Sequence, residues 1–256
     1  MTDFIKCGIP LKNDYKKIIS SNSFKEMEKF SEIFILRNKK ELQEYIYKWV
    51  EDPLHQWSRQ WEYPYVFSKI INTVENNNVK TNILDAGSGV TFFPYFLKNK
   101  INNSSIFCCD NDKSLDSIYQ KINDKTKDTL KFSNTDLRDL NFENESFDII
   151  YCISVIEHIK NYERVVEELY RVLKLGGSLI VTFDISTDGL HDISIEKASE
   201  LLSYFNKIFK DDYTKIIDLK SEVKASEIFT TITARDLNEK LLLSLIHISE
   251  PTRQEA

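Results

Sequence analysis

A short glycine-containing stretch, LDAGSG at residues 84–89, places the tightest limit on how this chain can fold. The chain has only six glycines in 256 residues, and two of them lie here, directly after an aspartate. The overlapping segment TNILDA, residues 81–86, is typical of a buried strand, and an apolar helical segment follows. A strand that ends in a glycine turn before a helix is typical of parallel α/β sheets. Such sheets bind their ligands at the carboxyl ends of the strands.

Further strand-like segments follow and alternate with helical ones. We predict strands in SSIFCCD, TLKFSNTD, SFDIIYCIS and GSLIVTFD, which cover residues 104–110, 129–136, 146–154 and 177–184. A sixth strand is predicted in TKIIDL, residues 214–219, whereas IFTTITA, residues 228–234, fits a strand or a loop. Strands that alternate with helices predict an α/β fold with a mostly parallel sheet covered on both faces.

Two amphipathic helices accompany the later strands. The segment 161–177 has one apolar face and ends in a glycine pair suited to a C-cap. The segment 194–209 begins with Ser194 as a predicted N-cap, and Lys197 stands where a capping box has glutamate. The first helix has its apolar face at Val165, Val166, Leu169, Val172 and Leu173.

The chain divides into three predicted parts. Residues 1–78 form an N-terminal helical extension, because apolar residues recur there at helical spacing before an Asn-rich connector. Residues 79–242 form the α/β domain. Residues 243–256 include LSLIHISEPTR, which resembles the in-frame translation of a sequencing adapter, so we predict that they are foreign to the protein.

Composition limits the partners. The net charge of −6 gives no basic field for phosphate backbones, so we expect no nucleic acid and favour a small-molecule substrate. Neither a run of 18 apolar residues nor a signal-peptide pattern is present, so we expect a cytoplasmic protein with no membrane partner. The four cysteines lack CxxC pairing, which favours buried thiols over a metal site. The oligomeric state is not predicted.

The residues of the opening stretch favour a particular ligand chemistry. Gly87 and Gly89 permit a sharp turn and a close approach of the backbone to a ligand. Dinucleotide sites use GxGxxG, but here Asp85 precedes the glycines and no third glycine follows. A carboxylate repels phosphate and suits a cation, such as an amino group or a sulfonium. An ordinary tight turn is the alternative interpretation.

Acidic residues recur at the ends of the next two strands. Asp110 is placed where a carboxylate can accept hydrogen bonds from both hydroxyls of a ribose. Asp136 can accept from an adenine amino group, and Leu137 can cover the ring. An acid at a strand end can equally be a helix cap or a solvated loop residue.

The ordered series from residue 82 to residue 183, with SVIEHI at 154–159 and LKLGG at 173–177, resembles class I S-adenosylmethionine-dependent methyltransferases. The resemblance implies S-adenosylmethionine as cofactor, and a Rossmann-like fold with a seven-stranded, mostly parallel sheet. It implies that Ser154 lies near the sulfonium, that Asp110 with Asn111 holds the ribose, and that Asp136 and Leu137 hold the adenine. The loop around the methionine part is implied to be Asp85, Ala86, Gly87, Ser88 and Gly89. Leu175 replaces the usual proline of LKPGG.

The sequence also contains candidates for a catalytic residue and for residues that contact the acceptor. His158, expected at the start of the helix after the fourth strand, is the candidate general base, although a packing or capping role would also fit. His191 is a second histidine that could face the acceptor. The resemblance implies that the N-terminal extension, residues 1–78, is a lid over the cofactor and the acceptor. Arg59 or Tyr63, in an aromatic cluster of this extension, is predicted to reach the cofactor carboxylate or the acceptor. The alternative is that these aromatics only pack the extension onto the sheet.

We therefore predict an S-adenosylmethionine-dependent methyltransferase that modifies an oxygen, nitrogen or carbon of a small molecule. The acceptor is predicted to be a sugar or polysaccharide precursor, because the sequence TFDISTDGLHDIS, residues 182–194, resembles that of sugar-modifying methyltransferases. A catalytically silent S-adenosylmethionine-binding subunit is one alternative. An NAD(P)-dependent oxidoreductase is another, and Asp85 and the missing third glycine disfavour it.

Overall fold

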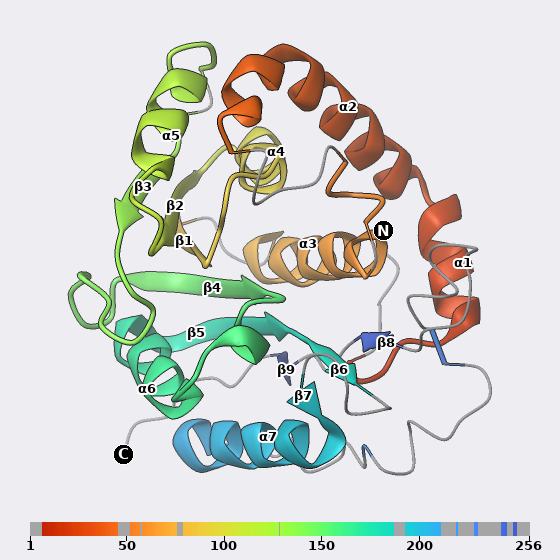
Figure 1. Cartoon of the computed structure of the whole chain (residues 1–256), viewed down its shortest axis with the longest axis vertical. Coiled ribbons are helices and arrows are strands. Elements are labelled where there is room, and N and C mark those ends of the chain that lie inside the picture. The colour runs from red at the N-terminus through yellow and green to blue at the C-terminus, as the bar shows by residue number, and fades with distance from the viewer. Residues whose placement is uncertain are drawn as a thin grey trace.

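A parallel sheet of five strands forms the centre of the molecule (Figure 1). The structure is a computed structural model, and it describes residues 7–45, 52–56, 58–75, 79–127, 129–186, 193–210, 219, 228–229, 242–244 and 248–249. The strand order is β3-β2-β1-β4-β5, with β9 added antiparallel at the β5 edge. The parallel strands are β1 (Thr81–Ala86), β2 (Ser104–Asp110), β3 (Lys131–Asn134), β4 (Phe147–Ile153) and β5 (Leu173–Thr182).

Helices cover both faces of this sheet. One face is covered by α1 (Lys12–Ser20), α2 (Asn22–Gln43), α3 (Arg59–Glu75), α4 (Phe93–Lys100) and α5 (Leu115–Asn123), and the other by α6 (Tyr162–Val172) and α7 (Ile195–Phe209). A short 3₁₀ turn, η2 (Ile156–His158), follows β4. In the part of the chain that the structure describes, none of the helices has the length and apolar character needed to cross a membrane.

Alternation along the strands explains the two-sided packing. In β1, Ile83 packs in the cluster with α1 to α5, whereas its neighbour Leu84 packs in the cluster with α6 and α7. Cys108 and Cys109 of β2 divide between the two clusters in the same way. All four side chains are fully buried, because successive residues of a strand point to opposite faces and both faces are covered.

The predicted segments are confirmed for the five parallel strands and for the helices around them. Ser194 accepts from the backbone N–H of Lys197 at 3.4 Å, so the predicted N-cap of α7 is confirmed. The seven-strand count is not confirmed. The predicted strand at 214–219 lies outside the described residues apart from Leu219, and of 228–234 only residues 228–229 are described.

The sequence predicts that the helix ends at the glycine pair of LKLGG, residues 176–177, and this prediction is wrong. Helix α6 ends at Val172, and Leu173 is already extended at φ −79° and ψ 134°. The glycines lie within β5, where the register with β4 shifts between Phe147 and Ile149. Gly177 packs against the neighbouring strand so closely that a Cβ would lie 2.9 Å from the carbonyl oxygen of Asp148. Strand pairing therefore overrides the local cap signal, because tertiary contacts outweigh weak local preferences.

Three short strands form a second sheet in the order β7-β6-β8: β6 (Asp184–Ser186), β7 (Ile193–Ser194) and β8 (Leu242–Ser244). Strand β9 (Ile248–Ser249) and most of β8 fall within residues 243–256, which the sequence predicts to be foreign. A sheet edge offers unpaired N–H and C=O groups to any extended segment. Their pairing therefore does not test that prediction, and the three-part division of the chain stays a prediction.

Candidate functional site

The glycine turn after β1 lies against the end of β2. Gly87 and Gly89 both have positive φ, +80° and +51°, which glycine adopts without steric cost. The backbone N–H groups of Gly87 and Ser88 donate to the carbonyl of Cys109 at 2.9 and 3.0 Å. A Cβ at Gly87 would lie 2.7 Å from both methyl groups of Val155, so there is no room for a side chain at this position. The backbone at this strand end is therefore held in one position.

Asp110 closes β2 and holds the same turn from the other side. Its carboxylate accepts from the backbone N–H of Gly89 and from that of Asp112, each at 3.0 Å. A carboxylate has about four lone-pair sites, so further acceptor capacity remains after these two bonds. Asp110 can therefore position the loop and still accept from a ligand.

The loop after β3 carries Asp136 and Leu137. Leu137 is buried, whereas Asp136 is exposed enough to pair with Arg138, whose Nε and guanidinium NH2 donate to it at 2.9 and 2.6 Å. This pairing lowers the pKa of Asp136, so the carboxylate is ionised at neutral pH. The loop thus presents an ionised acceptor beside an apolar side chain.

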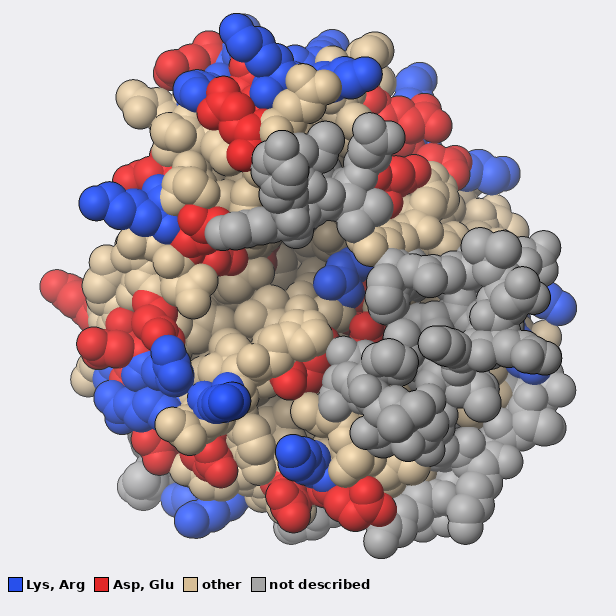
Figure 2. Space-filling view, viewed as in Figure 1, with Lys and Arg blue, Asp and Glu red and all other residues tan. Residues whose placement is uncertain are grey.

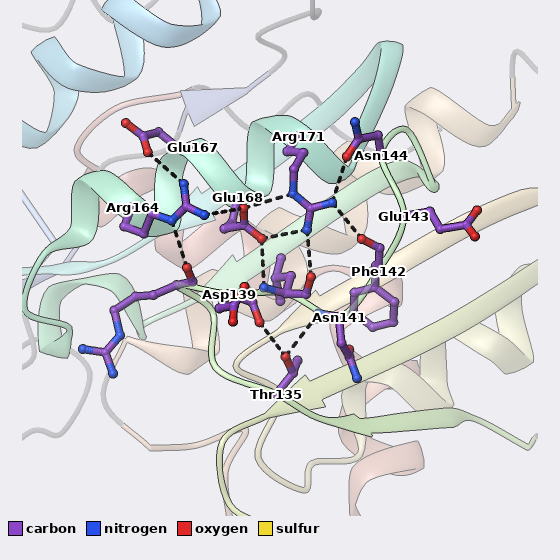
Figure 3. A network of polar contacts seen from close by, with 12 residues as sticks. Thr135, Asp139, Asn141, Phe142, Glu143, Asn144, Arg164, Glu167, Glu168 and Arg171 are labelled. Atoms are coloured by element: carbon purple, nitrogen blue, oxygen red, sulfur yellow. Dashed lines mark hydrogen bonds and ion pairs between the residues drawn. The ribbon is translucent and has the colours of Figure 1, made fainter.

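Two residues of α6 hold this loop (Figure 3). Arg171 donates to the carbonyls of Leu140 and Phe142 at 2.7 and 2.8 Å. Glu168, which is buried, accepts from the N–H of Leu140 at 2.9 Å and from Arg171 at 2.7 Å. The network in Figure 3 therefore holds the backbone at Leu140 and Phe142, in the same loop as Asp136 and Leu137.

We expect Arg171→Ala to lower the free energy of unfolding by about 2 kcal/mol, because it leaves two carbonyls unpaired and Glu168 buried with fewer partners. Urea unfolding of the two proteins measures this difference. Arg37→Ala, on the exposed surface of α2, is the matched control and is expected to change stability by less than about 0.5 kcal/mol. Equal effects of the two substitutions would contradict this role of Arg171.

A cavity of about 480 Å³ lies at these strand ends. Its lining brings together seven of the residues that the sequence singled out, from the ends of β1, β2, β3 and β4: Gly87, Asp110, Asn111, Asp136, Leu137, Ser154 and His158. Figure 2 shows that this side of the molecule is hollowed near its centre, and that the described charges around the hollow are of both signs. Residues that line one cavity from four successive strand ends define a ligand site.

Ser154 connects the cavity to α3. It has φ +46°, and its backbone N–H donates to the carbonyl of Thr182 at 2.9 Å. The Ser154 hydroxyl donates to Glu62 Oε1 at 2.7 Å, and Arg59 donates to both the Ser154 hydroxyl and Glu62. The carboxylates of Glu62 and Asp184 raise the pKa of Arg59 against the effect of burial. Arg59 is therefore charged and lies next to a cavity-lining residue.

Other predicted residues lie behind the cavity wall. Asp85 is buried and accepts from the Tyr151 hydroxyl at 2.9 Å, and burial raises its pKa to about 8. Tyr63 is buried between Phe92 and Phe93, with ring centroids 5.1 and 4.8 Å away. Asp85, Ala86, Ser88, Gly89, Arg59 and Tyr63 are not among the residues that line the cavity.

The predicted base, His158, lines the cavity, with its side chain 62% exposed. Its Nε2 lies 4.0 Å from Oε1 of Glu157, which is buried. The ring is thus open to solvent on one side and next to a carboxyl group on the other. The other predicted histidine, His191, lies outside the described residues.

Sequence reasoning missed several residues of the site. Val155, Arg138, Ile159 and Lys160 line the cavity beside the predicted ones. Tyr45 lies over the glycine turn, because its hydroxyl would be 3.6 Å from a Cβ at Gly89. Burial and the Asp110 carboxylate raise the pKa of Tyr45 to about 12, which keeps it a hydrogen-bond donor. Tyr45 follows the end of α2 and is remote from the motifs along the chain, so the local sequence around it gave no signal.

The donor and acceptor chemistry of this cavity fits an adenosyl cofactor. Asp110 and Asp136 are acceptor-only groups that suit the hydroxyls of a ribose and the amino group of adenine. Leu137 adds an apolar surface between them. Two carboxylates at successive strand ends disfavour the pyrophosphate of a dinucleotide. The residues present therefore fit S-adenosylmethionine and would hold its ribose at Asp110 and its adenine at Asp136 and Leu137.

Comparison with known proteins agrees with this fit. Residues 84–181 match the family described as methyltransferase domain. The chain is 26% identical over 192 residues to a ubiquinone biosynthesis O-methyltransferase of Rickettsia akari (strain Hartford), across 75% of this chain and 71% of that protein. It is 26% identical over 145 residues to a sarcosine/dimethylglycine N-methyltransferase of Aphanothece halophytica, across 56% of this chain but only 50% of the relative.

Among solved structures, the chain is similar to Haemonchus contortus phosphoethanolamine N-methyltransferase 2 in complex with phosphomonomethylethanolamine and S-adenosylhomocysteine. The TM-score is 0.45 and the identity 16%, across 63% of this chain and 44% of that one. With the ordered motifs and the family match, the chain is a class I S-adenosylmethionine-dependent methyltransferase. Its cofactor is S-adenosylmethionine.

Proposed function

We propose that this methyltransferase acts on a small-molecule acceptor bound beside Ser154, between the carboxyl ends of β4 and β5 and the start of α3. The observation that carries the proposal is the cavity at the strand ends, which leads from the residues that fit adenosine to Ser154. The next groups beyond Ser154 are Glu62 and Arg59, which are polar and partly or wholly buried. Such groups orient a small ligand rather than a long polymer.

When bound, S-adenosylmethionine supplies a methyl group on a positively charged sulfur. The residues of the chain then have to position the acceptor and exclude water. The turn at Gly87 and Gly89 provides a close approach of backbone, and Asp110 and the loop at Asp136 fix the adenosine end. We propose that Arg59 binds the cofactor carboxylate or the acceptor, and that His158 is the general base where an acceptor proton must be removed.

We propose that the methylated atom is an oxygen, nitrogen or carbon of the acceptor. The sequence favours a sugar or polysaccharide precursor, whereas the names of similar proteins include O- and N-methyltransferases of small molecules. From the net charge and the composition we also propose a cytoplasmic location and no nucleic acid partner. An N-terminal lid formed by residues 1–78 is supported by Tyr45, which lies over Gly89.

Calorimetric titration of the full chain with S-adenosylmethionine and S-adenosylhomocysteine tests this function. We expect micromolar dissociation constants for both, or about −8 kcal/mol, and no binding of NADH. Release of S-adenosylhomocysteine in the presence of small-molecule acceptors then tests transfer. Binding without release for any acceptor would favour the silent regulatory subunit, and binding of NADH would favour an oxidoreductase.

A further inference from the structure

The outer part of the cavity is lined by residues that the adenosine end does not use. Ser154 and Val155 begin this part at the end of β4, and His158, Ile159 and Lys160 continue it along the loop that leads to α6. The turn η2 orders this loop, because the backbone N–H of His158 donates to the carbonyl of Val155 at 3.0 Å. The space that remains for an acceptor therefore adjoins one short, ordered loop.

The charged side chains of the cavity lining are unevenly distributed. The two acids among the described lining residues, Asp110 and Asp136, both lie at the adenosine end, and Arg138 is paired there with Asp136 at 2.6 Å. Lys160 lies in the outer part, is exposed, and forms no hydrogen bond or ion pair through its side chain within the described residues. The described lining of the outer part thus contains an unpaired cation and no acid.

An acid behind the cavity wall does not act as a counter-ion for this lysine. Oε1 of Glu157 lies 4.0 Å from Nε2 of His158, but the Glu157 side chain is fully buried and is not among the groups that line the cavity. Burial, followed by the carboxylate of Asp184, raises the pKa of Glu157 well above its usual range, which favours its neutral form. The positive charge of Lys160 is therefore left for a ligand to compensate.

Two apolar side chains accompany the lysine in this part of the cavity. Val155 directly follows Ser154 in the chain, Ile159 directly precedes Lys160, and all four residues line the cavity. Val155 and Ile159 are partly buried and pack on the core cluster with α6 and α7. The outer part therefore offers apolar contacts together with one fixed positive charge, which suits a ligand that has an apolar body and a charged group.

We infer that the methyl acceptor carries an anionic group, a carboxylate or a phosphate, which Lys160 binds. This inference rests on the proposed function and names its substrate class. An uncharged acceptor would cover the lysine and leave its charge without a partner, whereas an anionic oxygen accepts a charge-assisted hydrogen bond from it. The sulfonium of the bound cofactor adds a second positive charge to the site, so a cationic acceptor is disfavoured further.

The test uses the full chain saturated with S-adenosylhomocysteine. Butyrate and butyl phosphate are compared with butanol and butylamine at equal concentration and ionic strength, and the unfolding temperature is measured. We expect an upward shift with the two anions only, because a ligand that binds the folded state stabilises it. In Lys160→Ala the anion concentration that gives half of the shift is expected to rise about tenfold. Lys160→Arg, which keeps the charge, and Lys29→Ala, on the exposed surface of α2, are expected to keep the response.

Several results would overturn the inference. Equal shifts with all four probes, no shift with the anions, or an unchanged anion response in Lys160→Ala would each do so. Weaker binding of S-adenosylhomocysteine by Lys160→Ala would instead assign this lysine to the cofactor carboxylate. A larger shift with butyrate than with butyl phosphate would assign a carboxylate acceptor, and the reverse order a phosphate. If the wild-type chain binds no S-adenosylhomocysteine, the proposed function itself fails, which separates the two failures.

Discussion

Asp110→Ala is expected to weaken S-adenosylmethionine binding by about 10- to 100-fold, or about 1.4 to 2.8 kcal/mol. Two effects add. The substitution removes the acceptor for the ribose hydroxyls, and it releases the backbone N–H of Gly89, which donates to this carboxylate at 3.0 Å. The turn then loses the bond that holds it to the end of β2. Calorimetric titration of both proteins measures the ratio of dissociation constants.

Two further variants separate these effects. Asp110→Asn keeps one oxygen that can accept from Gly89 but loses the charge, so we expect a smaller loss of affinity than for alanine. Asp116→Ala, on the exposed side of α5, is the matched control and is expected to bind the cofactor as the wild type does. Unchanged affinity in Asp110→Ala would refute the placement of the ribose at Asp110.

The fold and much of the cavity could be predicted from the sequence, because both depend on short local patterns. The strand β1 and its glycine turn are encoded within nine residues, 81–89, and the later strand ends follow in chain order. Parallel strands bring their carboxyl ends to one edge of the sheet, so Asp110, Asp136 and Ser154 meet in one cavity without any long-range information.

The parts that the sequence did not predict depend on contacts between distant segments. Nothing in the residues around Glu157 indicates that Asp184 and Glu62 will lie beside it, since Glu62 precedes it by almost 100 positions. The glycine pair of LKLGG fits a helix cap when only the neighbouring residues are considered. It lies in β5 because Gly177 packs against the backbone of Asp148. Asp85 fits a ligand-facing acid in the motif, yet the pleat of β1 places it on the buried α3 face beside Tyr151.

The burial of Asp85 makes the stability of the protein depend on pH. The pKa of Asp85 rises from 3.8 to about 8, mainly through burial, with Asp110 adding to the rise and Tyr151 opposing it. Between these values the folded state holds a proton that the unfolded state has lost. The contribution of Asp85 to stability is therefore full below about pH 4 and is lost as the pH rises through about 8.

We therefore expect Asp85→Asn to become more stable relative to the wild type as the pH rises. The difference between their free energies of unfolding should change by about 4 kcal/mol between pH 5 and pH 8, since each pKa unit is worth about 1.4 kcal/mol and most of three units is covered. Glu157 and His55, whose pKa values are also raised, are present in both proteins and cancel from this difference. Urea unfolding at several pH values measures it.

The pH dependence of this stability difference distinguishes a neutral Asp85 from an ionised Asp85 in the folded protein. If Asp85 were ionised and paired with a cation in the folded protein, its pKa would be lowered, and the difference would be constant above pH 5. Asp116→Asn, which changes an exposed carboxylate, is the control and should give that constant difference. A flat difference for Asp85→Asn would mean that this aspartate is charged behind the glycine turn without a bound ligand.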